Sequence, residues 1–394
     1  MANAAPYNPA TTPSLKGPIL SLTSVRFFAA FYVVLLHSTM WTHHEDVSTW
    51  CGRFLRNGYT AVGFFFVLSG YILAHVYLNT DRPFNRRAFW TSRFARAYPL
   101  LFASLLLDAP HSYAIRLTLY SVKIAIIRTA VAFTSEAALL QAWDARFRNI
   151  NAPSWSLSAE AFFYLLFPFT ALWIWRCKGI RAATLLAFFW GCAMLTPMLV
   201  THRDASLFFE VPTSVLQQRI ELLPLLRIFE FFAGISLCAV QQSLTVRFDA
   251  VQRSRMAHAA LAAAAVFFYV AIDHANQIPL LVMSNGFLLP TYSLLIFALV
   301  NLRGPLQNLL AHKSLVILGE ASYALYLLHA PLWLYFSDLH AIDTLPIWLL
   351  FIAILLSISV ASFYWLERPI RKLILARASI RPTVTLQQEA APQP

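Results

Sequence analysis

Apolar residues form ten stretches along this chain, each near the length that a helix needs to cross a bilayer, and short polar segments separate them. The ten predicted helices cover roughly residues 22–41, 58–78, 94–108, 154–175, 182–200, 225–241, 257–272, 280–301, 315–336 and 345–366. The pattern predicts an all-α fold: a polytopic transmembrane helix bundle with about ten spans.

Composition supports this fold class and narrows the chemistry. Hydrophobic residues make up 59% of the 394 residues and charged residues 12%, whereas soluble domains carry about 25% charged residues. The four cysteines are scattered, and adjacent residues in the loop His43–Asp46 do not converge on one ion by default. We therefore expect no metal site.

Topology, rather than nucleic-acid binding, explains the net charge of +12. Lysine and arginine concentrate in alternate connecting segments, as the positive-inside rule describes, so we expect no nucleic-acid partner. The distribution places both termini in the cytoplasm. Residues 1–18 are then a disordered tail, 19–372 a single transmembrane domain, and 373–394 a second, largely disordered tail.

The stretch 113–133 is the least certain part of the topology. It is apolar, but Arg116, Lys123 and Arg128 interrupt it. An interfacial amphipathic helix and a re-entrant element both fit this pattern. A spanning helix would reverse every later loop, which the charges of Arg176–Arg181 argue against.

Two ionisable residues lie in the first predicted span. Arg26 and His37 are eleven residues apart, close to three helical turns, so they share one face about 16 Å apart along the helix. Either side chain is costly in lipid, roughly 2.5 kcal/mol or more for a central arginine. We therefore expect both to face the protein interior.

Three other spans carry ionisable residues at the depth of His37. These residues are Glu160, Glu230 and His329. Polar contacts between helices would explain each one alone, whereas four helices with such groups at one depth favour a site. Histidine suits a general base, and a carboxylate beside it orients the ring. Glu160 and Glu230 are the candidate partners of His37, and His329 is the rival base.

Two further positions are candidates on the cytoplasmic side. Arg93 and Arg96 share a helix face, where they either anchor the topology or bind phosphate. Ser69 and Gly70 lie within the second span, where a small pair allows close helix packing or a narrow path beside the helix.

Seven motifs in one order resemble the acyltransferase-3 family of integral membrane O-acyltransferases, over about residues 21–370. They are Arg26 followed by His37, Phe64–Gly70, Arg93–Pro99, Trp155–Tyr164, Arg227–Gly234, Gly319–Pro331 and Glu367–Pro369. Two positions depart from the family pattern. Gly63 stands where many members have an acid, and Ala161 where a second consecutive acid is frequent.

The resemblance implies transfer of an acyl group, usually acetyl from acetyl-CoA, to a hydroxyl group. The implied acceptor is a carbohydrate of the cell envelope or a small molecule, and the implied location is a bacterial inner membrane. Acyl-CoA would be a co-substrate, with no permanently bound cofactor, and the lipid bilayer would surround the bundle.

A mechanism follows as a hypothesis. Arg93 and Arg96 hold the coenzyme phosphates, and the pantetheine arm passes Arg26 and the Ser69–Gly70 region. His37 then removes the acceptor proton while Glu160 orients it. The alternative function is a proton-coupled transporter of a sugar or lipid-linked envelope precursor, which would use the same buried groups as a proton relay.

Overall fold

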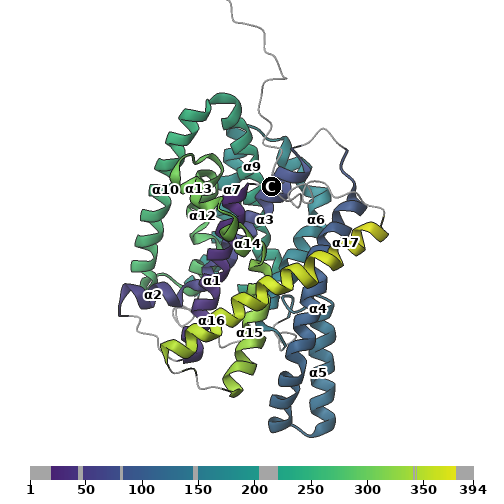
Figure 1. Ribbon diagram of the computed structural model, residues 1–394. Helices are drawn as coiled ribbons and strands as arrows, with labels where there is room; N and C mark the ends of the chain where they lie inside the picture. Colours follow the sequence, from purple (N-terminus) through teal and green to yellow (C-terminus); the bar gives the residue numbers. More distant parts are fainter. Residues whose placement is uncertain are drawn as a thin grey trace, which may run out of the picture.

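Helices make up the regular structure of this protein (Figure 1). The computed structural model describes residues 19–42, 48–79, 83–144, 150–203, 221–339, 342 and 344–378, and no strand occurs among them. The prediction of an all-α bundle is confirmed for these residues. The loop His43–Asp46 and both predicted tails beyond residue 378 and before residue 19 lie outside them.

The long helices account for most of the bundle. They are α1 (Leu20–Thr42), α3 (Ala61–Tyr77), α4 (Arg86–Leu119), α5 (Val122–Ala137), α6 (Trp155–Arg176), α7 (Ile180–Arg203), α9 (Pro224–Arg247), α10 (Ala250–Asp273), α12 (Leu289–Asn301), α15 (Ser322–Leu339) and α16 (Leu345–Ser362).

Short helical segments connect them. They are α2 (Trp50–Arg56), η2 (Gly58–Thr60), η4 (Ala152–Ser154), η6 (Ala275–Gln277), α11 (Leu280–Val282), η7 (Met283–Phe287), α13 (Pro305–Leu310), α14 (Lys313–Glu320), η8 (Phe363–Glu367) and α17 (Arg368–Arg377).

Nine of the ten predicted spans coincide with a helix that is long and apolar enough to cross a membrane. In the part of the chain that the structure describes, eight single helices meet this condition, and α14 with α15 forms a ninth across a bend of 57°. The tenth, 94–108, lies inside α4. This helix has 34 residues, but five arginines and an aspartate make it too polar to meet the same condition.

The stretch 113–133 is not one element. The last residues of α4 occupy its start, and Tyr120 adopts an extended conformation that ends the helix. α5 then packs along α4, so the two form a hairpin that projects at the lower right of Figure 1. Arg128 donates to the Tyr120 hydroxyl over 3.0 Å at the tip of this hairpin.

The C-terminal helices cross the front of the bundle in Figure 1. α16 and α17 form one tilted rod, joined by the π-helical segment η8. A π-helical turn inserts an extra residue, which changes the face that the following helix presents. Glu367 at the end of this segment is thereby buried against α4.

The centre of the bundle is the crossing of α3 and α9. Glycines allow the two backbones to approach each other. A Cβ atom on Gly70 would lie 2.0 Å from the carbonyl oxygen of Phe231, and one on Gly234 would lie 2.0 Å from that of Val67. Close contact through small residues is typical of helices that pack within membranes.

Candidate active site

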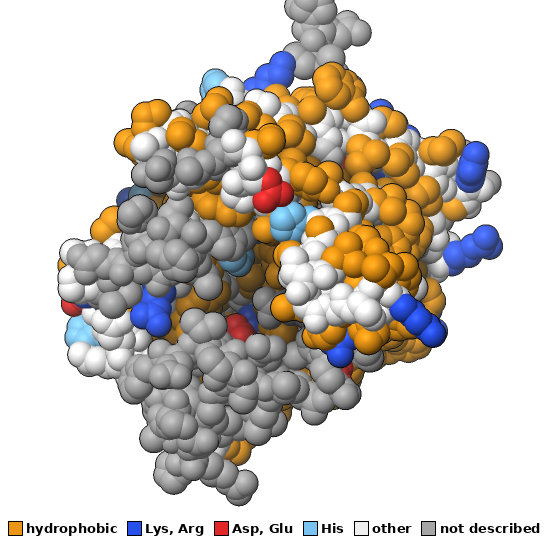
Figure 2. Space-filling model, turned by 90° about the horizontal axis from the view of Figure 1, so that it is seen from below, with side chains coloured by type: hydrophobic (Ala, Val, Ile, Leu, Met, Phe, Trp, Pro, Cys, Tyr) orange, Lys and Arg blue, Asp and Glu red, His pale blue; other side chains and the backbone are white. Residues whose placement is uncertain are grey.

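A cavity of about 180 Å³ lies among α1, α3, α4, α6 and α15. Its charged and polar lining residues are Arg26, Ser69, Arg93, Arg96, Ser156, Glu160, Tyr164, Ser322, Tyr323 and Tyr326. Phe65, Phe66 and Leu157 are among its apolar wall residues. Figure 2 views the bundle from below, and it shows a hollow on this face with histidine, acidic and basic side chains among apolar ones.

Arginines dominate one end of the cavity. Arg93 donates to the Tyr77 hydroxyl over 3.3 Å, but its buried Nε has no hydrogen-bond partner in the described chain. Arg26 interacts electrostatically with Glu160, Glu320 and Glu367 and with Arg96, yet its guanidinium donates no hydrogen bond to any described residue. Both arginines therefore retain donors for an anionic ligand.

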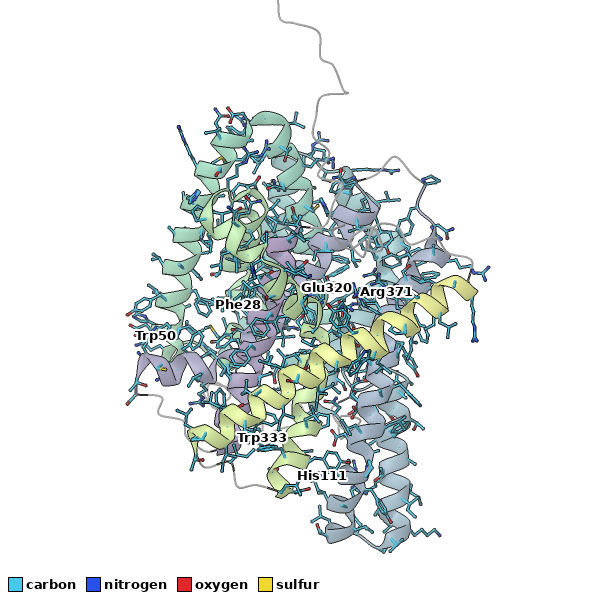
Figure 3. All side chains as sticks on the ribbon, in the orientation of Figure 1. Phe28, Trp50, His111, Glu320, Trp333 and Arg371 are labelled. Atoms are coloured by element: carbon cyan, nitrogen blue, oxygen red, sulfur yellow. The ribbon has the colours of Figure 1, made fainter. Side chains whose placement is uncertain are left out.

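Arg96 differs from these two because it has an ion-pair partner. Its Nη1 lies 2.8 Å from the Glu367 carboxylate, whose side chain is 3% exposed. Its Nη2 is 3.4 Å from the Glu320 carbonyl oxygen. Glu320 and Arg371 lie close together in Figure 3, and their charges interact. Arg96 thus joins α4 to the C-terminal helices as well as lining the cavity.

Glu160 lies among hydroxyl groups and not beside His37. Ser69 donates to Glu160 Oε1 over 3.0 Å, and the Tyr164 hydroxyl donates to the same oxygen. The hydrogen bonds that Glu160 makes to described residues involve Ser69 and Tyr164 and not His37, so the structure does not support the expectation that Glu160 orients His37. Its Oε2 has no hydrogen-bond partner among the described residues, and the residue lines the cavity.

His37 and His329 contact each other directly. His37 Nδ1 and His329 Nε2 are 3.0 Å apart, and His329 Nδ1 is 2.7 Å from the Tyr326 carbonyl oxygen. A carbonyl oxygen only accepts, so His329 carries its proton on Nδ1 when neutral and accepts at Nε2. His37 then donates from Nδ1, and its lone pair lies on Nε2. We call this pair the histidine dyad.

Tyr326 connects the histidine dyad to the cavity. Its hydroxyl donates to the Pro153 carbonyl over 2.9 Å and lies 2.9 Å from the Ser156 hydroxyl. Tyr326 and Ser156 both line the cavity, and the rings of Tyr326 and His329 are 6.1 Å apart. The dyad therefore lies next to Tyr326, a cavity residue, and His37 is about three helical turns along α1 from Arg26.

Glu230 is separate from this arrangement. Its Oε2 lies 3.2 Å from Arg227 Nη2, and its Oε1 accepts from the Gly286 backbone N–H over 3.2 Å. Arg227 also donates to the Ser284 carbonyl and to Asn285 Oδ1. The prediction that Glu230 is a partner of His37 is wrong in the structure, because both of its oxygens face α9 and the π-helical segment η7.

The structure also shows what surrounds the two glycines, Gly63 and Gly70, that the sequence analysis singled out. A Cβ atom on Gly63 would lie 3.0 Å from Glu230 Oε1, so the Glu230 carboxylate occupies the space beside this departure from the family pattern. Gly70 faces the backbone of α9 and does not line the cavity, whereas Ser69 does. The coenzyme-binding prediction is therefore wrong for Gly70, which has a packing role.

Several residues in or around the cavity were not predicted. Tyr77 and Tyr164 are aromatic residues within apolar helices, where the sequence pattern alone does not distinguish them from core residues. Glu367 belongs to a family motif, which was the available signal for it. Within the described residues, no group of three or more histidine, cysteine, aspartate or glutamate side chains is arranged to hold a metal ion.

Comparison with known proteins identifies the family. The family model named for an acyltransferase domain matches residues 19–366. The chain is 30% identical to the acyltransferase MdmB of Streptomyces mycarofaciens over 328 residues, which are 78% of this chain and 77% of that protein. No solved structure matches.

Longer relatives match at lower identity. The O-acetyltransferase OatA of Staphylococcus aureus is 24% identical over 93% of this chain and 58% of its own length. YrhL of Bacillus subtilis, provisionally named a peptidoglycan O-acetyltransferase, is 22% identical over 90% of this chain and 55% of its own length. This chain thus spans little more than half the length of these two relatives. The match over residues 19–366 shows that the chain belongs to the acyltransferase-3 family of membrane O-acyltransferases.

Proposed function

We propose that this protein transfers an acetyl group from acetyl-CoA to a hydroxyl group of a cell-envelope glycan. One observation carries the proposal: a single cavity begins at arginines with unused donors and ends beside the histidine dyad. This arrangement fits a donor with anionic phosphates at one end and a reactive thioester at the other.

The arginine end would bind the coenzyme phosphates. Arg93 and Arg26 would contact them, because guanidinium groups bind phosphate through paired hydrogen bonds. A cavity of about 180 Å³ is smaller than the roughly 300–1,000 Å³ of drug-sized ligand sites. It would therefore take the narrow pantetheine arm, while the nucleotide stays at the mouth.

The dyad end would supply the base. His37 Nε2 would accept the proton of the acceptor hydroxyl as its oxygen attacks the thioester carbonyl. A C–O bond forms, the C–S bond breaks, and the proton held on His37 is then donated to the departing sulfur. The products are the O-acetyl ester and free CoA. His329 would stabilise the protonated His37 through the bond to its Nδ1–H.

The cellular direction follows from the charge pattern. By the positive-inside rule, the arginine end would face the cytoplasm and the dyad would lie toward the outside. We assign the protein to the bacterial inner membrane on this basis. The name of YrhL, which mentions peptidoglycan, supports an envelope acceptor. Membership of an enzyme family favours transfer over the proton-coupled transport that the sequence also allowed.

Acetyl transfer by the purified protein tests this function. Protein in proteoliposomes receives radiolabelled acetyl-CoA and soluble peptidoglycan fragments, and alkali-labile label on the fragments is counted. We expect His37→Ala to lose at least about a hundredfold of the rate while acetyl-CoA binding persists. His258→Ala is the matched control, since this exposed histidine bonds only within α10.

Three results would count against the proposal. Wild-type transfer by His37→Ala would remove the base role. Label that reaches no envelope glycan in a wild-type extract, although the donor binds, would refute the acceptor class. Uptake of a glycan precursor without transfer of label would select transport.

A further inference from the structure

The segment 150–154 lies between the α4–α5 hairpin and the reactive end of the cavity. It includes η4, and α6 begins directly after it at Trp155. Its placement therefore decides where Ser156 projects into the cavity. Its Pro153 carbonyl also receives the hydroxyl of Tyr326.

Glu136, in the last turn of α5, holds this segment from one side. Its side chain is 0% exposed. Oε1 accepts from the Ile150 backbone N–H over 2.7 Å, and Oε2 accepts from the Asn151 N–H over 3.2 Å and the Ser154 hydroxyl over 3.0 Å. Bonds to a carboxylate are stronger than neutral ones, so this set fixes both backbone and side chain of the segment.

The segment contacts α15 on its other side. Asn151 Nδ2 donates to the Leu327 carbonyl over 2.8 Å, and Tyr326 donates to the Pro153 carbonyl. The Tyr326 carbonyl in turn receives His329 Nδ1. A continuous series of hydrogen bonds therefore runs from the hairpin to the histidine dyad.

We propose that Glu136 is a positioning residue for acyl transfer: by fixing residues 150–154, it fixes the parts of α6 and α15 that carry Ser156 and His329. The inference rests on the proposed function. Glu136 does not line the cavity and would not touch the reacting atoms. Its effect would come through geometry, and a displacement of about 1 Å can lower a rate about a hundredfold.

Glu136→Gln tests the role without changing shape. The amide places an N–H donor where one oxygen accepted, so at least one bond to the segment is lost. We expect kcat to fall about 10- to 100-fold with the KM for acetyl-CoA within about twofold, because the bond series does not include Arg26 or Arg93. Thr134→Val is the matched control, since this exposed hydroxyl bonds only within α5.

Two measurements keep the test decisive. Ser154→Ala removes one of the three bonds recorded between Glu136 and the described segment 150–154. It should lower kcat less than Glu136→Gln, again without a change in KM. Hydrogen–deuterium exchange should be faster at the Ile150 and Asn151 amides in Glu136→Gln, but not in Thr134→Val. Exchange needs no turnover, so it is independent of the proposed function.

The outcomes separate clearly. Normal kcat with normal exchange in Glu136→Gln overturns the inference. Equal loss of kcat and of acetyl-CoA binding, together with a lower melting temperature, shows a merely structural role and also overturns it. If the wild-type protein transfers no acetyl group, the proposed function fails. The exchange measurement still applies in that case: faster exchange in Glu136→Gln shows that Glu136 fixes the segment, and unchanged exchange shows that it does not.

Discussion

The bond between His37 and His329 predicts that an acceptor at position 329 matters more than the imidazole itself. His329→Leu removes the acceptor that keeps the His37 proton on Nδ1, and it also removes the donor to the Tyr326 carbonyl. His329→Gln keeps an amide oxygen that can accept from His37 and an N–H that can donate. The two variants differ little in volume, so they separate hydrogen bonding from packing.

The size of the effect follows from what the bond does. A neutral hydrogen bond contributes about 1 kcal/mol, which sets a lower limit near fivefold in rate. If leucine also lets His37 adopt the other tautomer or turn away, most of the base contribution is lost, about 10²–10⁴-fold. We expect kcat to fall at least about 100-fold in His329→Leu and about tenfold or less in His329→Gln.

The assay is acetyl transfer to peptidoglycan fragments over a range of acetyl-CoA concentrations. The KM for acetyl-CoA should stay constant in both variants, because neither histidine lines the arginine end of the cavity. Melting temperatures in detergent control for folding, since His329 is 0% exposed. Equal kcat in the leucine and glutamine variants would refute the reasoning, as would a leucine variant within threefold of wild type.

Three further changes have defined outcomes. Arg93→Ala should raise the KM for acetyl-CoA about 10- to 100-fold by loss of a charge-assisted bond. Arg87→Ala, on the exposed side of α4, should leave the KM unchanged. Equal KM values in the two variants would show that Arg93 only anchors the topology. Gly70→Ala should destabilise the bundle by at least roughly 1 to 3 kcal/mol, since its Cβ would lie 2.0 Å from a carbonyl oxygen of α9, and an unchanged melting temperature would contradict this. Glu367→Gln leaves Arg96 without its buried counter-charge and should cost about 3 kcal/mol of stability, which a melting curve measures; a shift of under a degree would show that the pair is dispensable.

The helical architecture could be predicted from the sequence because membrane spans have a strong signal. Nine of the ten predicted spans correspond to a helix, or to helical segments joined at a bend or a π-helical turn, that is long and apolar enough to cross a membrane. The exception is 94–108, which lies inside α4. The break at Tyr120 was beyond that reasoning, because it depends on one extended residue and on the fit of α5 against α4. Apolar content predicts that a helix forms, but not where it turns back.

The candidate site was predicted only in part. Helical periodicity placed Arg26 and His37 on one face, and depth placed His329 level with His37. Depth alone could not say which groups at one level meet, since that depends on helix rotation and lateral position. Glu160 therefore has Ser69 and Tyr164 as partners, although its expected depth matched that of the histidines.

The buried arginines of this bundle differ in whether their charge and their hydrogen-bond donors have partners. Arg96 and Glu367 form an ion pair between α4 and the end of η8, whereas Arg227 and Glu230 form one within α9. The two members of a buried ion pair compensate each other's charge, so removing one of them is strongly destabilising. Arg93 and Arg227 each have a buried Nε with no hydrogen-bond partner among the described residues, and a missing bond costs free energy. Arg93 differs from Arg227 because it lines the cavity, where a ligand could complete its bonds. It is therefore the residue where loss of donor binding would be most informative.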